Sequence, residues 1–591
     1  MVRPLPLALF LPAAAVFAVG AHAQEQELPL VTEMPALAAP VPGDESADGL
    51  VIDIQDDLDE AEIDALLAGL GVQLVDTTDA ADGNLYTFRG DAADLKKVLR
   101  ALQGQRFVEG VEPNVRYGLF DQGIEAPADT EPAKPTPVKP NDPMYKHQWH
   151  FDMVNAEDAW LRTQGEGVVV AVIDTGVSPG KLPSGQSSRW KRVPDLKETG
   201  FVDGWNFVDN NNDPSDGNGH GTHVAGTIAQ STNNGFGVAG LAPKAKIMPI
   251  KVLSDRGSGT VADIANGIRF AADHGAKVIN MSLGGGLYSS TLARAVKYAH
   301  DKGVVVACAA GNGSRAKVEY PAAYAGAFAV SALGPDGTLA FYSSHGKETD
   351  IAAPGGDTRV DLNKDGIPDG VLQDTIARGD PTAHGFFPYQ GTSMATPHVA
   401  AAAALVIAQG VTDPDRVEKV LQGSAKDLKD ALRYGAGGLD VGAATRKGTR
   451  DHALGGLGLA VVAAAIGIRR ARRRDGMLHT ARVTPGFVGS VVIGSGAVFA
   501  FIAGFPALAG VAALMGVAVV IAPFTVLYGV KKARPMLAGL AFGLAGYLLV
   551  RAVLGSVDVS LIPGHGAWDM AWLSVSGLVS YGLGALALRR D

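Results

Sequence analysis

Three short segments of the sequence carry the side chains that nucleophilic catalysis requires. Asp174 ends an apolar run, His220 opens a stretch of small residues, and Ser393 follows a Gly-Thr pair. A hydroxyl becomes a nucleophile when a base lies within about 3 Å of it and a carboxylate orients that base. Each segment alone is a weak signal, but together, in the order Asp, His, Ser, they indicate a hydrolase with a serine nucleophile.

The three segments resemble the catalytic motifs of the subtilisin-like serine peptidases, the subtilase family. They read Val-Ala-Val-Ile-Asp174-Thr-Gly, Asn-Gly-His220-Gly-Thr-His-Val-Ala-Gly and Gly-Thr-Ser393-Met-Ala-Thr-Pro-His. The resemblance covers about residues 141–445, and this family has the triad order Asp, His, Ser. It implies that Asp174 orients the imidazole, that His220 is the general base and acid, and that Ser393 is the nucleophile.

Two further segments resemble the family's oxyanion and substrate-binding regions. Asn312, within Ala-Ala-Gly-Asn-Gly, is expected to donate its side-chain amide to the tetrahedral oxyanion together with the backbone N–H of Ser393. The second segment follows an apolar strand and resembles the edge where an extended peptide pairs as an added strand. Its residues are Ser282, Leu283, Gly284 and Gly285.

Glu319 corresponds, by the same resemblance, to the floor of the pocket that receives the side chain before the scissile bond. A carboxylate at the end of an apolar pocket attracts Lys or Arg, because a low dielectric strengthens the interaction. The walls stay apolar, so Leu and aromatic side chains are still accepted. The alternative is that Glu319 turns outward and pairs with Arg315 or Lys317, where it contributes little.

The elements that position these residues alternate between buried strands and helices. Apolar runs at 167–173, 246–252, 277–281, 304–307 and 327–330 are separated by helical stretches. This alternation predicts an α/β fold, a doubly wound parallel sheet covered by helices on both faces. In such sheets, catalytic groups lie at the carboxyl ends of the strands.

A smaller region precedes the peptidase-like part. Residues 49–118 predict the order βαββαβ, a small α+β sandwich that resembles the family's inhibitory propeptide. Residues 1–23 are expected to be a signal peptide, because Arg3, an apolar run and Ala21-His22-Ala23 fit export and cleavage. The propeptide is then 24–120, and a Pro-rich linker, 121–140, is exposed to cutting before the peptidase domain at 141–445.

Calcium is the expected cofactor, in a structural role. The segment Asp361 to Asp369 has oxygen-bearing side chains at alternate positions and glycine at the sixth, as in the first half of a calcium loop. Leu372 stands where an EF-hand has its bidentate glutamate, so a shorter loop or a plain polar surface loop are the alternatives. The expected ligands are Asp361, Asn363, Asp365, Ile367 and Asp369, and the family resemblance suggests a second site at Asp195 and Asn234.

The charges of the chain are divided unevenly. Of 51 Lys and Arg and 61 Asp and Glu, residues 451–591 hold 12 basic and 5 acidic ones, so this tail carries +7 and the first 450 residues carry −17. An acidic body offers no basic surface to DNA or RNA and excludes nucleic-acid binding. The single cysteine, Cys308, permits neither an intrachain disulfide nor a cysteine-based zinc site.

The tail reads as membrane-spanning. Residues 483–530 contain no charged side chain, and 48 residues of helix extend about 72 Å, enough for two crossings. Five helices are expected in this all-α tail, at 452–468, 486–504, 507–530, 535–554 and 570–588. Arginine and lysine clusters after the first, third and fifth place the C-terminus in the cytoplasm of a bacterial cell and the peptidase domain in the periplasm or outside. Arg551, Arg446, Lys447 and Arg450 run against this rule.

The sequence therefore predicts an exported serine endopeptidase, anchored in the inner membrane and made as a self-processing zymogen. Its partners are expected to be protein or peptide substrates, its own propeptide as inhibitor, and the membrane, with the chain itself a monomer. The alternative is a catalytically silent, subtilase-like binding module whose tail carries the function. An intact triad and Asn312 argue against silence.

Overall fold

The computed structural model describes residues 49–119 and 139–448, two helices at 534–554 and 567–587, and residues 461, 464–466, 488 and 491. Short gaps fall at 78–79, 81–82, 179–181, 185–192, 286 and 378–379. The expected signal peptide and most of the expected linker lie outside the described residues. So do the expected helices 452–468, 486–504 and 507–530, apart from the few residues named.

The N-terminal unit, residues 49–118, is a four-stranded antiparallel sheet carrying two helices, in the order expected from the sequence. Each helix begins at an aspartate whose side chain accepts backbone N–H groups of the first turn: Asp59, in a capping box with Glu62, and Asp91. The unit has its own apolar core. Its elements are β1 (Leu50–Ile54), α1 (Glu60–Leu70), β2 (Val75–Asp76), β3 (Asn84–Phe88), α2 (Ala92–Leu102) and β4 (Val108–Pro113), with sheet order β2-β3-β1-β4.

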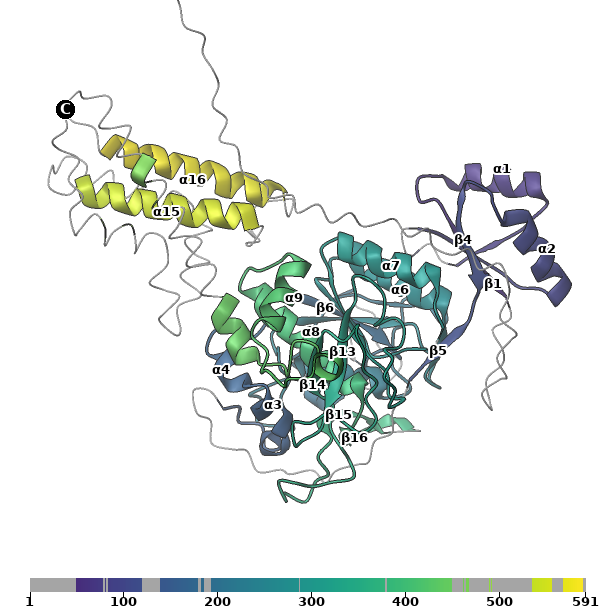
Figure 1. Cartoon of the computed structure of the whole chain (residues 1–591), viewed down its shortest axis with the longest axis horizontal. Coiled ribbons are helices and arrows are strands. Elements are labelled where there is room, and N and C mark those ends of the chain that lie inside the picture. Colours follow the sequence, from purple (N-terminus) through teal and green to yellow (C-terminus); the bar gives the residue numbers. More distant parts are fainter. Residues whose placement is uncertain are drawn as a thin grey trace, which may run out of the picture. The chain divides into compact units, whose positions relative to one another are not determined.

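A parallel sheet forms the centre of the second unit, residues 139–448 (Figure 1). Its strand order is β14-β13-β12-β11-β6-β9-β7, and β8 also pairs with β9. The strands are β6 (Val169–Asp174), β7 (Gly200–Phe201), β8 (Trp205–Asn206), β9 (Lys246–Lys251), β11 (Val278–Met281), β12 (Val305–Ala309), β13 (Phe328–Leu333) and β14 (Ile351–Pro354). The doubly wound parallel sheet predicted from the sequence is therefore the observed fold.

Helices cover both faces of this sheet. Successive residues of a strand point to opposite faces, so each strand contributes side chains to two apolar cores. In β6, Val170 and Val172 pack with α5 (His220–Ala229), α8 (Thr392–Ala408) and α9 (Pro414–Gln422) in one core. Ala171 and Ile173 pack with α6 (Val261–Asp273) and α7 (Ser290–Asp301) in the other. Strands buried on both faces explain the near-continuous apolar runs in the sequence.

Smaller elements complete the two units. They are β5 (Arg116–Gly118) paired with β10 (Ser258–Thr260), the hairpin β15 (Val371–Ala377) and β16 (Asp380–Tyr389), and the short helices η1 (Tyr145–His147), α3 (Trp149–Met153), α4 (Ala156–Trp160), η2 (Pro194–Leu196) and α10 (Ala431–Tyr434). The pairing of β5 with β10 joins the chain that leaves the N-terminal unit to the peptidase-like unit.

The tail is helical where it is described. Helices α15 (Arg534–Leu554) and α16 (Ala567–Ala587) cover most of the two last spans expected from the sequence. Among the described residues, no helix is long and apolar enough to cross a membrane.

Candidate active site

Asp174 and His220 meet where a strand ends and a helix begins. Asp174 is the last residue of β6, His220 is the first residue of α5, and His220 Nδ1 lies 2.8 Å from Asp174 Oδ1. Both side chains are buried. A carboxylate only accepts, so Nδ1 carries the proton and Nε2 is the basic nitrogen of the neutral ring. Gly221 allows this approach, because a side chain there would meet the backbone oxygen of Gly176.

A buried carboxylate that the sequence reasoning missed fixes the turn before His220. Asp216 is fully buried and accepts five hydrogen bonds, from Thr175 Oγ1, from the N–H groups of Asn218 and Gly219, and from the N–H and hydroxyl of Thr222. Burial raises the pKa of Asp216, and Lys251 and these donors oppose that effect. A signal was present in the sequence, since an aspartate two residues before Asn218 can form such a turn.

Ser393 is the second residue of α8 and is tied to the loop after β11. Its Oγ lies 3.3 Å from the backbone oxygen of Ser282, and Ser282 Oγ donates to the backbone oxygen of Ser393 at 2.7 Å. The two helices that carry His220 and Ser393 pack against each other on the same face of the sheet. The nucleophile is thus held by backbone contacts with the expected substrate edge.

Asn312 lies just beyond the end of β12, and its orientation is fixed by its neighbours. Its Oδ1 accepts the backbone N–H of Thr392 at 2.9 Å and the hydroxyl of Thr392 at 2.7 Å. A backbone N–H can only donate, so the oxygen of the amide faces Thr392 and the NH₂ group faces away from it. Thr392 precedes Ser393, which links the expected oxyanion donor directly to the expected nucleophile.

The expected substrate edge is occupied by the chain's own segment from the N-terminal unit. Gly118 and Gly284 exchange backbone hydrogen bonds of 3.2 and 3.3 Å in an antiparallel bridge. Leu119 donates to the backbone oxygen of Gly257 at 3.0 Å, so the segment lies between β10 and the loop that follows β11. Gly285 pairs with Tyr320 and lies against the ring of Tyr117, while Leu283 is buried in the core.

Comparisons with known proteins assign this chain to a family. Residues 165–437 match the Subtilase family, peptidase S8. Thermitase from Thermoactinomyces vulgaris is 40% identical over 300 residues, 51% of this chain and 96% of thermitase, and Subtilisin Savinase from Lederbergia lenta is 39% identical over 308 residues, 50% of this chain and 98% of Savinase. The chain belongs to the subtilase family. It is a serine-type endopeptidase, and the alternative of a silent binding module has no support.

A solved structure agrees with this assignment. Fervidolysin from Fervidobacterium pennivorans, described as a keratinolytic enzyme related to subtilisin, is 25% identical, with a TM-score of 0.53. The match covers 68% of this chain and 61% of the fervidolysin chain. The subtilisin-like parallel sheet expected from the sequence is thus found in the structure and in relatives.

Glu319 of this subtilase lies against Gly311 and Gly313, which flank Asn312, the expected oxyanion donor. A Cβ built on Gly311 would be 2.6 Å from Glu319 Cδ, and one built on Gly313 would be 3.2 Å from Glu319 Oε1. Glu319 is half-buried, and burial raises its pKa, although Arg315 and Lys317 act in the opposite direction. Neither of these two described side chains forms an ion pair with Glu319. Glu319 therefore lies beside the oxyanion segment, and its place in the substrate pocket and its role in specificity stay predictions.

The side chains of the expected calcium loop, residues 361–369, hydrogen-bond to one another and to backbone N–H groups of the loop. Asp361 accepts the N–H groups of Asp365 and Gly366, and Asp365 accepts that of Ile367 and lies 2.7 Å from His147 Nδ1. Asn363 Nδ2 donates to Asp365, and the Asp369 carboxylate accepts the N–H of Leu362. Among the described residues, the one group of three acidic or histidine side chains at metal-ligand spacing lies elsewhere. The loop thus does not gather its three carboxylates, although its oxygen donors suit calcium, which stays a prediction here.

Asp195 and Asn234 are brought together, as expected for the second site. Asn234 Nδ2 donates to Asp195 Oδ1 at 2.8 Å, and the backbone N–H of Asn234 donates to Asp142 Oδ1 at 3.0 Å. Asp142 and Asp195 are buried; burial raises the pKa of Asp142 to about 6 and raises that of Asp195, near Asp374, well above its usual range. Hard oxygen donors with few compensating cations fit a calcium ion. Asp142 was missed because nothing in its local sequence marks it.

Proposed function

We propose that this subtilase hydrolyses peptide bonds through Asp174, His220 and Ser393. Ser393 Oγ attacks the scissile carbonyl, His220 Nε2 takes the proton and returns it to the leaving amine, and Asp174 orients the ring and stabilises the imidazolium. Water then hydrolyses the acyl-enzyme, with His220 again as the base, and frees Ser393. The observation that carries this proposal is the 2.8 Å contact between Asp174 Oδ1 and His220 Nδ1, which leaves Nε2 as the base.

The oxyanion of the tetrahedral intermediate would be bound by Asn312 Nδ2 and the N–H of Ser393. The hydrogen bonds from Thr392 to Asn312 Oδ1 support this role, because they turn the NH₂ group away and keep it available. A preorganised donor of this kind contributes about 10²–10³ in turnover.

The N-terminal unit would be an inhibitory propeptide that the enzyme removes from itself. The pairing of Gly118 with Gly284 supports this, because it occupies the edge that a substrate would need. A cleavage register that continued the antiparallel bridge of Gly118 and Gly284 by two positions would bring residue 120 opposite Ser282, whose backbone oxygen is 3.3 Å from Ser393 Oγ. We therefore assign the scissile bond to Phe120-Asp121, at the start of the Pro-rich linker.

Active-site labelling tests both parts of this proposal. A fluorophosphonate should label the wild-type chain at Ser393 and leave Ser393→Ala unlabelled, and the labelled species should begin at Asp121. Purified Ser393→Ala protein should keep its propeptide. Normal maturation of this variant, with no other protease present, would contradict self-processing, and labelling of the variant would contradict the assignment of the nucleophile.

Export and membrane attachment are further parts of the proposal. They rest on residues 1–23 and on the charge-free run 483–530, which lie outside the described residues apart from 488 and 491. The peptidase domain would lie in the periplasm or outside, with the C-terminus in the cytoplasm. A reporter active only in the periplasm should work when fused after Gly566 and fail after Asp475 or Asp591. The opposite result at Asp475 would overturn this orientation.

Calcium would stabilise the native peptidase domain. The donors are Asp195 and Asn234, joined by Asp142, and the 361–369 loop. An ion that binds only the folded state raises the melting temperature by mass action. If neither calcium nor a chelator changes the melting curve of the Ser393→Ala protein, both proposed calcium sites are contradicted.

A further inference from the structure

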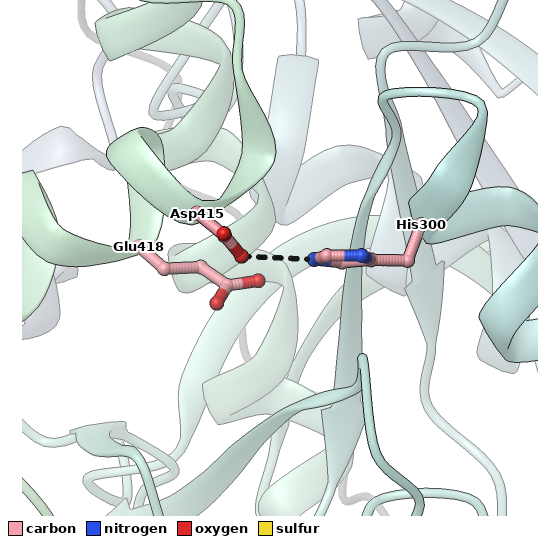
Figure 2. A group of neighbouring side chains, drawn as sticks. All are labelled: His300, Asp415 and Glu418. Atoms are coloured by element: carbon pink, nitrogen blue, oxygen red, sulfur yellow. Dashed lines mark ion pairs between the residues drawn. The ribbon is translucent and has the colours of Figure 1, made fainter. Parts of the chain in front are cut away.

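Three side chains of types that bind metal ions lie together between two helices, away from the residues assigned to catalysis. His300 lies at the end of α7, and Asp415 and Glu418 lie one turn apart near the start of α9. One ligand atom from each residue lies within 4.8 Å of the others, and His300 Nε2 is 3.3 Å from Asp415 Oδ1. Figure 2 shows both carboxylates reaching from one helix toward the edge of the His300 ring.

Glu418 is half-buried, and one of its two carboxylate oxygens has no hydrogen-bond partner among the described residues. Its Oε1 is shielded from solvent and accepts no hydrogen bond within the described part of the chain. The charges that act on it most strongly are three carboxylates, Asp350, Asp413 and Asp415, against one amine, Lys419. An unpaired buried carboxylate costs free energy unless a cation or a donor compensates it. The cluster therefore has a surplus of negative charge and a free oxygen ligand.

The helices hold these side chains in place. Asp413 caps α9 by accepting the N–H of Arg416 at 3.0 Å, and Pro414 fixes the first helical position. At the other side, Gly326 lies against the His300 ring, where an added Cβ would be 3.2 Å from His300 Cβ. Residues spaced i and i+3 on a helix share one face, so Asp415 and Glu418 can bind the same ion.

We propose that His300, Asp415 and Glu418 bind a divalent transition-metal ion such as Zn²⁺. One imidazole nitrogen and two carboxylate oxygens are ligands of this class, with bonds of about 2.0–2.2 Å. Tetrahedral ligands at that distance are roughly 3.4 Å apart, so small rotations of the exposed Asp415 and of Glu418 close the site. Water completes the coordination on the exposed side. The bound ion links the end of α7 to the start of α9.

Zinc binding to the full-length Ser393→Ala chain tests this site without self-digestion. We expect one Zn²⁺ to bind and to raise the melting temperature. His300→Gln and Asp415→Asn should each weaken zinc binding by at least about ten-fold, because each removes one of three ligands. Asp415 is exposed, so its variant should keep the metal-free melting temperature of the parent protein. Excess Ca²⁺ should not displace the zinc, since calcium prefers sites made of oxygen alone.

Matched controls separate this site from others. Asp301→Asn, next to His300 on the same helix, and His345→Gln should leave zinc affinity unchanged. Replacing zinc with Co²⁺ should give a visible absorption band that changes in His300→Gln. Zinc affinity that is equal in the parent and both ligand variants, or no binding up to about 1 mM zinc, overturns the proposal.

Discussion

Glu112 holds both the backbone N–H and the hydroxyl of Ser290 through a single oxygen, Oε2, at 2.9 and 3.1 Å. Its other oxygen accepts Ser289 Oγ at 2.5 Å and the N–H of Thr291 at 3.0 Å. The carboxylate of the N-terminal unit thus fills the start of α7, where the helix dipole and unpaired N–H groups favour an anion. Glu112 lies only six residues before Gly118, which occupies the substrate edge.

The first prediction is that Glu112→Ala weakens inhibition by the propeptide. Each hydrogen bond to a buried charge contributes about 1.5–3 kcal/mol, so the inhibition constant should rise roughly 10²-fold. The measurement is inhibition of the mature enzyme by an added fragment spanning residues 49–120. Lys97→Ala, on an exposed position of α2, should inhibit as the parent fragment does. Equal inhibition by the Glu112 variant would show that the contact is not formed in solution.

The second prediction concerns the cleavage point. Phe120→Asp should slow self-processing by about ten-fold or more, because a second carboxylate would enter a pocket lined by Glu319. Processing is followed as the appearance of a chain that begins at Asp121. Ala126→Asp, further along the linker, should be processed at the parent rate. If the mature chain instead begins within 126–143 in both variants, the register argument is wrong and the linker itself is cut.

The sequence predicted the sheet, the two layers of helices and the residues of the candidate triad, because these depend on local patterns. Buried strands are visible as apolar runs, His220 lies between two glycines, and Asp174 is followed two positions later by Gly176. Glu112 was missed for a physical reason. Its role depends on which backbone N–H groups come to face it, from a helix up to 179 positions away, and no local pattern reports that. Asp216, in contrast, binds the turn that directly follows it, and only its burial could not be read from the local sequence.

The third prediction is that Asp216 acts as a positioning residue for His220. In Asp216→Asn, an NH₂ group would face N–H donors, so we expect a loss of about 2–4 kcal/mol in stability. The shifted turn should lower kcat by roughly 10²-fold with little change in KM, since ground-state binding does not use this turn. Kinetics on a peptide substrate and denaturant unfolding measure the two effects. Asp209→Asn, in an exposed loop nearby, should change neither, and a variant that loses stability but keeps its kcat would contradict the positioning role.

The fourth prediction is acid instability from a buried histidine pair. His150 Nδ1 lies 2.8 Å from His398 Nε2, and His398 Nδ1 lies 2.8 Å from the backbone oxygen of Met394. A carbonyl only accepts, so His398 Nδ1 carries a proton. In the neutral His398 ring Nε2 is an acceptor, and His150 Nδ1–H then donates to it. Burial of both rings favours this neutral pair in the folded state.

Burial lowers the pKa of His398 to about 4 and that of His150 well below its usual range. The unfolded state binds these protons first, so stability is complete above about pH 6.5 and falls as pH decreases, by about 1.4 kcal/mol per pH unit for each histidine. Urea unfolding of the Ser393→Ala protein at pH 5 and 7.5 measures this. His398→Gln should reduce the slope of the unfolding free energy against pH by the equivalent of about one proton, whereas His345→Gln should leave it unchanged. An equal slope in the two variants would contradict the prediction.

The fifth prediction is that Glu319 sets a preference for basic side chains before the scissile bond. Its carboxylate lies against Gly311 and Gly313, beside Asn312, and is half-buried. A Lys side chain entering this pocket would meet a negative charge in a medium of reduced dielectric. Phe and Leu would still bind through the apolar walls. The ratio of kcat/KM for matched peptides ending in Lys and Phe isolates this effect, because both substrates share the triad.

In Glu319→Gln the Lys-to-Phe ratio should fall by about ten-fold, equivalent to roughly 1.4 kcal/mol of lost attraction. The same ratio in the parent enzyme should fall as pH decreases through the raised pKa of Glu319, since protonation removes the charge. Titration of His220 changes both rates equally and leaves the ratio alone. Lys317→Gln removes an exposed neighbouring charge and should change the ratio by less than about two-fold. A ratio that does not fall in Glu319→Gln would mean that this carboxylate does not reach the bound side chain, and the specificity must then come from the apolar walls.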